Sequence, residues 1–280
     1  MVQTSTPAEV GGIPTDPQAT RRRVTHRILW GLAAAFVVLS VFQLGITPQR
    51  FTDALPRASF VWDRMWPPAI DDGGALSTAV VESLQIAIVG TAFGILLSIP
   101  LALIAARNVT PFAPLSLAMK GFAAFVRAVP ALIWAFLFIM AVGLGPTAGI
   151  LALAVNSTGM LVKVYAEALE EIPMGPIEAL QASGASRSHI AFQGILPSVV
   201  RLFIAWSVFR LDINVRYSTI LGVVGAGGIG WELTRAASLS RYDVALGITV
   251  VIFILVMATE AVSQWLRRRV DDDTAFRVEE

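Results

Sequence analysis

The sequence is poor in the side chains from which most enzyme sites are built. Its 280 residues contain no cysteine and only two histidines, His26 and His189. The absence of cysteine excludes a disulfide scaffold and thiolate metal sites, and neither histidine has a plausible catalytic partner nearby in the sequence. A Walker A motif is also absent, so the chain cannot by itself bind ATP in the P-loop manner. We therefore predict no catalytic residue, no metal site and no cofactor.

Charge is scarce as well. Charged residues make up 15% of the chain, against about 25% in a typical soluble domain. The net charge of +1 gives no support for nucleic-acid binding. Apolar residues reach 55%, and the mean hydropathy is +0.69. This balance, with several apolar runs near the length that crosses a bilayer, indicates an integral membrane protein in contact with lipid.

Six apolar runs are candidate spans. Only helices or closed barrels satisfy backbone groups in hydrocarbon, and the alternating pattern of a barrel strand is absent. We therefore predict an all-α polytopic membrane protein with six transmembrane helices. The six runs are Ile28–Ile46, Ala79–Ala106, Phe122–Leu144, Thr147–Leu169, Val199–Val224 and Val244–Trp265.

The basic residues predict the orientation. Eleven of them fall on one side of the six spans and five on the other, where six acids are interleaved with them. The basic side is cytosolic, so we expect a protein of the cell inner membrane with both termini in the cytosol. The predicted parts are a cytosolic tail (1–27), a membrane domain (28–269) and a second tail (270–280), with Gln49–Gly74 as an external loop. The first run is too long for a signal-peptide core and lacks a cleavage site, which favours a retained span.

A polar segment interrupts the apolar sequence between the fourth and fifth spans. Pro173 and Pro176 should end the preceding helix, and a short helix over 177–183 can follow. Gly184 permits a turn, and Ser186 can cap a second short helix before Pro197. The product would be an amphipathic helix–turn–helix on the cytosolic surface. Such a segment can serve as a docking site for a partner protein or can rest on lipid headgroups.

This segment resembles the EAA loop of ABC importer permeases, which is the coupling helix that docks on a cytosolic ATPase subunit. The resemblance rests on Glu178, Ala179, Gly184, Leu196 and Pro197. Two positions depart from the pattern. Leu180 replaces the second alanine, and Gly194 stands where isoleucine is usual.

A wider stretch is similar to the phosphonate-transport permeases of the MetI-like family. The matching pieces are VGLGPTAGILALA (142–154), YAEALEEI (165–172), RLDINVRYSTILGVVGAGGIG (210–230) and LRRRV (266–270). The resemblance implies a MetI-like permease fold in which the coupling segment is 173–197. It also implies the partners: a second permease copy forming a homodimer, two cytosolic ABC ATPase subunits, and an extracytoplasmic phosphonate-binding protein.

The fifth span carries Arg210, Asp212, Asn214 and Arg216. A charge at the centre of a membrane helix costs about 2.5–3.5 kcal/mol, so three facing lipid would cost roughly 8–10 kcal/mol. At 100° per residue, Arg210 and Asn214 share one face, and Asp212 and Arg216 share nearly the opposite one.

We predict a bracing ion pair between Asp212 and Arg216. We place Arg210 and Asn214 on the substrate pathway, because a guanidinium offers forked donors to a phosphonate. Asn156 and Ser157, near the middle of the fourth span, are further pathway candidates. In the alternative interpretation the four polar residues of span five form one internal network, and those of span four only bind helices together.

A glycine-rich run follows the fifth span. Gly225, Gly227, Gly228 and Gly230 fit G-x-G-x-x-G, but a dinucleotide fold needs that motif after a strand, and here it follows an apolar helix. We therefore expect the glycines to let a non-helical backbone pack closely, as a gate near the outer mouth or as simple packing.

Three classes of function remain open. The leading one is the permease subunit of an ATP-driven importer of phosphonates, with phosphate or phosphite as alternative substrates. A secondary transporter driven by an ion gradient would predict an inverted repeat and paired broken helices, and no internal repeat is evident. A membrane enzyme would need a catalytic cluster that the sequence does not offer.

Overall fold

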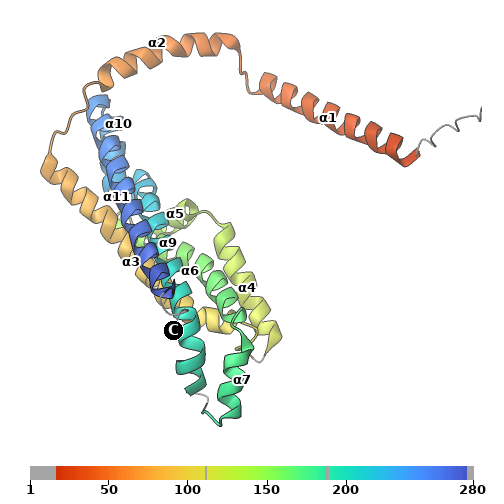
Figure 1. Cartoon of the computed structure of the whole chain (residues 1–280). Helices are drawn as coiled ribbons and strands as arrows, with labels where there is room; N and C mark the ends of the chain where they lie inside the picture. The colour runs from red at the N-terminus through yellow and green to blue at the C-terminus, as the bar shows by residue number, and fades with distance from the viewer. Residues whose placement is uncertain (1–16, 111, 187–188, 276–280) are drawn as a thin grey trace, which may run out of the picture. The chain divides into compact units, whose positions relative to one another are not determined.

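The computed structural model describes residues 17–110, 112–186 and 189–275, and in this part of the chain all regular structure is helical (Figure 1). The chain divides into two compact units, Met1–Trp62 and Asp63–Glu280. The elements are α1 (Pro17–Gln43), α2 (Pro48–Met65), α3 (Gly73–Ala105), α4 (Ala113–Ala128), α5 (Ala131–Val142), α6 (Pro146–Glu170), α7 (Met174–Ala182), the π-helix η1 (Ile190–Ile195), α9 (Leu196–Val223), α10 (Ile229–Ser238) and α11 (Tyr242–Ala275).

The first unit holds α1 and most of α2. The apolar stretch Thr25–Gln43 of α1 is long enough to cross a membrane and is not buried within the protein. Helix α2 lies almost entirely within the stretch Gln49–Gly74 that was predicted as an external loop, and no helix was predicted there. Its apolar residues Phe51, Leu55 and Trp62 recur at helical spacing, but the segment is too short and too rich in Arg and Asp to resemble a span, so hydropathy alone missed it.

The second unit is built on close packing between α3 and α6. Small side chains recur along α3 at intervals of three or four residues, and they are buried: Ser83, Ala87, Gly90, Gly94, Ser98 and Ala102. A Cβ at Gly90 would lie 2.8 Å from the Cβ of Leu153, and one at Gly94 would collide with Ser157. Small residues at helical spacing let two membrane helices approach closely, where dispersion forces and polar contacts hold them.

The third predicted span is bent. The run Phe122–Leu144 was expected as one helix, but α4 and α5 meet at an angle of 87°. The break falls at Val129, which is extended (φ −84°, ψ 119°), and Pro130. Proline has no N–H to donate and disfavours helical geometry in the residue before it, which explains the break. Pro100 lies inside α3 without ending it, so proline alone did not give the position away.

The other boundaries follow the predicted spans with extensions. Helix α3 begins at Gly73, six residues before the predicted Ala79, because the Asp72 carboxylate accepts hydrogen bonds from the N–H groups of Gly74 and Ala75. Helix α11 continues to Ala275, although 270–280 was expected as a tail. Residues 1–16 and 276–280 lie outside the described part.

In total, five helices of the described chain are long and apolar enough to span a membrane. Counting the bent α4–α5 pair as one span gives six, in agreement with the prediction.

Candidate functional site

The Arg210 guanidinium lies in the core of the second unit, between α9 and α6. Arg210 is 4% exposed. Its Nε donates to Ser157 Oγ at 2.9 Å, Nη2 donates to Asn156 Oδ1, and Nη1 lies 3.5 Å from the sulfur of Met160. Among the described residues, none of the ion pairs includes Arg210. A buried cation is therefore held by neutral partners, which leaves its charge uncompensated within this part of the chain.

Asn214 extends this group to a third helix. Its Nδ2 donates to Thr91 Oγ1 on α3 and to Ser157 Oγ on α6, both at 2.8 Å. Its Oδ1 is buried and has no hydrogen-bond partner among the described residues. We call Thr91, Asn156, Ser157, Arg210 and Asn214 the buried polar cluster. It joins the four residues predicted for the pathway. Thr91 was not predicted, because its distance of 123 residues from Asn214 left no signal in the sequence.

The opposite face of α9 carries the ion pair. Arg216 Nη2 lies 3.1 Å from Asp212 Oδ2 and 3.3 Å from Glu260 Oε2 on α11. The Asp212 side chain is 5% exposed, whereas that of Arg216 is 45% exposed. The predicted contact between Asp212 and Arg216 is thus present, with Glu260 as a third member. The polar residues of α9 form two groups on opposite faces, as the helical arithmetic predicted.

The glycine run forms the non-helical link between α9 and α10. Gly225, Gly227 and Gly228 have φ values of 101°, 81° and 71°. The link is fixed by Ile229 N–H, which donates to Ser83 Oγ at 2.8 Å, and by Gly145 N–H, which donates to the Gly225 carbonyl at 2.9 Å. A Cβ at Gly228 would collide with Ser83. Gly230 packs as closely on the Thr219 carbonyl of α9, so the run meets the predicted need for tight backbone packing.

A cavity of about 460 Å³ adjoins this link. Gly225, Gly227 and Gly228 border it together with Glu82 and Trp231. Two carboxylates, those of Glu82 and Glu232, give the cavity an acidic lining.

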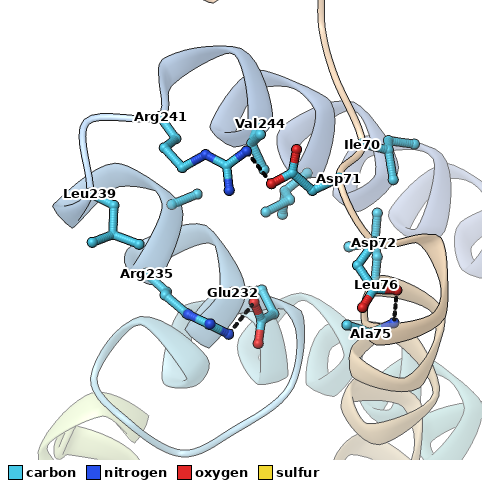
Figure 2. Close-up of a pocket in the computed structure, with 12 residues that line it drawn as sticks. Ile70, Asp71, Asp72, Ala75, Leu76, Glu232, Arg235, Leu239, Arg241 and Val244 are labelled. Atoms are coloured by element: carbon cyan, nitrogen blue, oxygen red, sulfur yellow. Dashed lines mark hydrogen bonds and ion pairs between the residues drawn. The ribbon is translucent and has the colours of Figure 1, made fainter.

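A smaller cavity of about 190 Å³ lies where α3, α10 and α11 begin or end (Figure 2). Four of its charged side chains are paired. Arg241 reaches Asp71, and Arg235 Nη1 lies 3.6 Å from Glu232 Oε2. The contact of Arg241 with Asp71 fastens the segment before α3 to the turn between α10 and α11, and the pair of Arg235 with Glu232 lies within α10, so a packing role accounts for both.

The polar segment after α6 is largely exposed. Glu178 and Ala179 are exposed on α7, and Leu196 and Pro197 are exposed at the start of α9. Gly184 has a φ of 77° and forms the predicted turn. The predicted second short helix takes another form: the π-helix η1 runs directly into α9, so no separate helix precedes Pro197. In the described structure, none of the five predicted coupling residues belongs to the buried polar cluster.

Among the residues that the structure describes, no group of three or more His, Asp or Glu side chains is placed to hold a metal ion.

Comparison with known proteins gives a consistent family. The family described as "Binding-protein-dependent transport system inner membrane component" matches residues 98–274. The chain is 43% identical over 257 residues to the phosphate-import permease protein PhnE of Mycolicibacterium smegmatis, a match that covers 91% of the chain. It spans only 47% of that relative, about half of its length.

A second relative is the putative cryptic phosphonate transport system permease protein PhnE2 of Escherichia coli. It is 39% identical over 118 residues, which are 42% of this chain and 97% of the relative. Among solved structures, the inward-facing MetNI methionine ABC transporter matches with a TM-score of 0.61 and 26% identity, covering 70% of this chain and 95% of that one. The fold is thus that of the MetI-like ABC permeases, as predicted from the sequence.

Proposed function

The chain belongs to the family of inner membrane components of binding-protein-dependent transport systems, and from this premise we propose that it is the permease subunit of an ATP-driven importer of phosphorus oxyanions. Phosphonates are the substrates that we propose first, and phosphate and phosphite are the alternatives. The relatives named for phosphate import and phosphonate transport support this class. ATP hydrolysis would reside in a partner subunit.

The observation that carries the proposal is the uncompensated charge of Arg210. A cation buried without a carboxylate is costly in a membrane helix, and such residues typically mark a pathway for ions or substrates. Arg210 uses three N–H groups on neutral partners out of the five that a guanidinium offers. The remaining donors can bind two oxygens of a phosphonate group in forked geometry.

Access to Arg210 requires movement. The side chain is covered by α6 in the present conformation, so substrate contact would need a second state in which α9 and α6 separate. ABC permeases alternate between two states whose populations are shifted by a ligand of the partner subunits. In our proposal Ser157, which also accepts from Asn214, holds Arg210 in the present state, and Asn156 lines the same path. The Asp212–Arg216 pair braces α9 against α11 through the contact of Arg216 with Glu260.

Force would enter through the exposed segment 173–197. Glu178 and Ala179 on α7, the Gly184 turn, and Leu196 with Pro197 would meet a groove of the cytosolic ATPase. We propose two copies of the permease, two ATPase subunits and an external binding protein for phosphonates, with both termini in the cytosol. The glycine link from Gly225 to Gly230 would close the outer mouth.

The rival classes make different predictions. A secondary transporter would carry substrate without any ATPase, and a phosphate permease would differ only in its ligand. The relative named for phosphate import favours the phosphate alternative, whereas no observation favours a secondary transporter.

The deciding experiment reconstitutes the chain with its ATPase and binding protein in lipid vesicles. Methylphosphonate, phosphate and phosphite are then compared with sulfate and methionine as stimulants of ATP hydrolysis. We expect stimulation by the phosphorus oxyanions, and stimulation by methionine alone would overturn the substrate class. ATP-independent uptake by the isolated chain would overturn the importer itself.

A further inference from the structure

A third cavity with a charged lining lies between α4 and α6, apart from the buried polar cluster. Its volume is about 230 Å³. Lys120 and Arg127 line it from α4, and Lys163, Glu167 and Glu170 line it from α6. Three cations against two carboxylates leave one positive charge in excess.

The ion pairs within the cavity show which cation carries the excess positive charge. Lys120 Nζ lies 2.7 Å from Glu170 Oε1, and Lys163 Nζ lies 3.6 Å from Glu167 Oε1. Arg127 is exposed, and among the described residues no ion pair or hydrogen bond of its side chain is found. A basic residue in the last turn of a helix also interacts with the helix dipole, but that interaction does not require a cavity.

The position of Arg127 is fixed by the packing of α4 on α6. Gly159 faces the end of α4, and a Cβ there would lie 2.8 Å from Val126 Cγ1 and 3.0 Å from the Arg127 nitrogen. The missing side chain at Gly159 therefore allows the backbone of Arg127 to lie against α6 at the edge of the cavity.

The cavity continues a stripe of α6 that begins at the buried polar cluster. Asn156 and Met160, which contact Arg210, and then Lys163, Glu167 and Glu170 follow one another at intervals of four and three residues, so they share one helix face. From Asn156 to Lys163 the rise is seven residues, or about 10 Å along the axis. In the predicted orientation this direction leads toward the cytosol.

We infer that this cavity binds one phosphorus oxyanion, through Arg127 and with Lys120 and Lys163 as shared donors. The inference rests on the proposed function in one respect: the transported anion on its way to the cytosol is one source of that group. The phosphate of an anionic lipid headgroup is the other, because basic pockets between membrane helices on the cytosolic side bind such headgroups. Both sources share the same chemistry, with forked N–H donors on a tetrahedral oxyanion.

The absence of cysteine in the chain offers a direct test. Ala124 lines the cavity and is exposed, so the A124C variant places a single thiol there. In the assembled transporter in phosphatidylcholine nanodiscs, we expect methylphosphonate or inorganic phosphate to slow labelling of this thiol by an uncharged maleimide at least threefold. A118C is the matched control, because Ala118 is exposed on the same helix but outside the lining.

Two further variants assign the binding group. R127Q in the A124C background should abolish the protection, whereas R268Q, which removes an exposed charge from the C-terminal half of α11, should leave it unchanged. Protection by the free anions in phosphatidylcholine identifies the transported anion as the source. Protection that develops only when phosphatidylglycerol replaces phosphatidylcholine identifies the lipid phosphate.

Labelling that neither free anion nor anionic lipid slows would overturn the site, and protection that persists in R127Q would overturn its assignment to Arg127. The assay needs no transport, so it stands or falls separately from the ATPase experiment that tests the importer.

Discussion

On one face of α9 the Arg210 guanidinium is held by neutral groups of α6, whereas on the other face Asp212 meets the guanidinium of Arg216. The two arginines lie six residues apart on the same helix. One is 4% exposed without an acidic partner in the described chain, and the other has a side chain that is 45% exposed and contacts two carboxylates. The first arrangement leaves charge available and the second uses it up, which separates a candidate binding group from a brace.

The bracing face gives the largest expected effect. Arg216→Ala leaves the buried Asp212 carboxylate without its cation, and removing one partner of a buried pair costs about 3 kcal/mol or more. We expect a large fall in the thermal midpoint of the purified permease and in its recovery from membranes. Differential scanning fluorimetry in detergent measures the first quantity.

The matched control removes both partners. Asp212→Ala combined with Arg216→Ala eliminates the uncompensated charge, so most of the lost stability should return. A double variant as unstable as Arg216→Ala would show that the pair is not a brace.

Substitution of Arg210, on the other face of α9, should reduce uptake rather than stability. Arg210→Gln removes the charge but keeps a polar side chain, and a charge-assisted hydrogen bond contributes about 1.5–3 kcal/mol. We therefore expect methylphosphonate uptake at low concentration to fall roughly 10- to 100-fold, with little change in the thermal midpoint. Uptake into vesicles with a saturated binding protein measures this effect.

Arg210→Lys sharpens the same test, since lysine keeps the charge and loses the forked donors. Its uptake should lie between those of the parent chain and Arg210→Gln. Normal uptake by both variants in correctly assembled transporter would remove Arg210 from the pathway and make both faces structural.

The two faces of α9 and most of the membrane spans could be predicted from the sequence. The spacing of Arg210, Asp212, Asn214 and Arg216 gives the two faces directly, because helix geometry is local. Hydropathy also placed most spans to within a few residues, since lipid demands long apolar helices.

The partners could not be predicted. Thr91 and Glu260 reach α9 from helices 123 and 44 residues away in sequence, and only the packing of three helices determines which polar groups meet. The bend at Pro130 was also missed, because a proline by itself does not show whether a helix ends there. Pro100 lies inside α3, and that helix continues through it. The amphipathic α2 was missed because its charges conceal it from a hydropathy average.

A smaller effect is expected within the buried polar cluster. Thr91→Val keeps the shape of the side chain and removes the oxygen that accepts from Asn214 Nδ2 at 2.8 Å. Asn214 keeps its second bond, to Ser157, so the loss should be about 1 kcal/mol. The thermal midpoint of the purified chain measures it. A loss as large as that in Arg216→Ala would mean that this face braces the helices as strongly as the ion pair does.

The smallest effect is expected at Glu260, the outer member of the brace. Its side chain is 40% exposed and lies 3.3 Å from Arg216, which still reaches Asp212 when Glu260 is neutral. Exposed pairs contribute about 0–1 kcal/mol, so Glu260→Gln should lower the thermal midpoint only slightly and leave uptake unchanged. Raising the salt concentration should reduce even that difference, because exposed pairs are screened. If Glu260→Gln instead matched Arg216→Ala, the stability of this face would depend on the contact of Arg216 with Glu260 more than on its contact with Asp212.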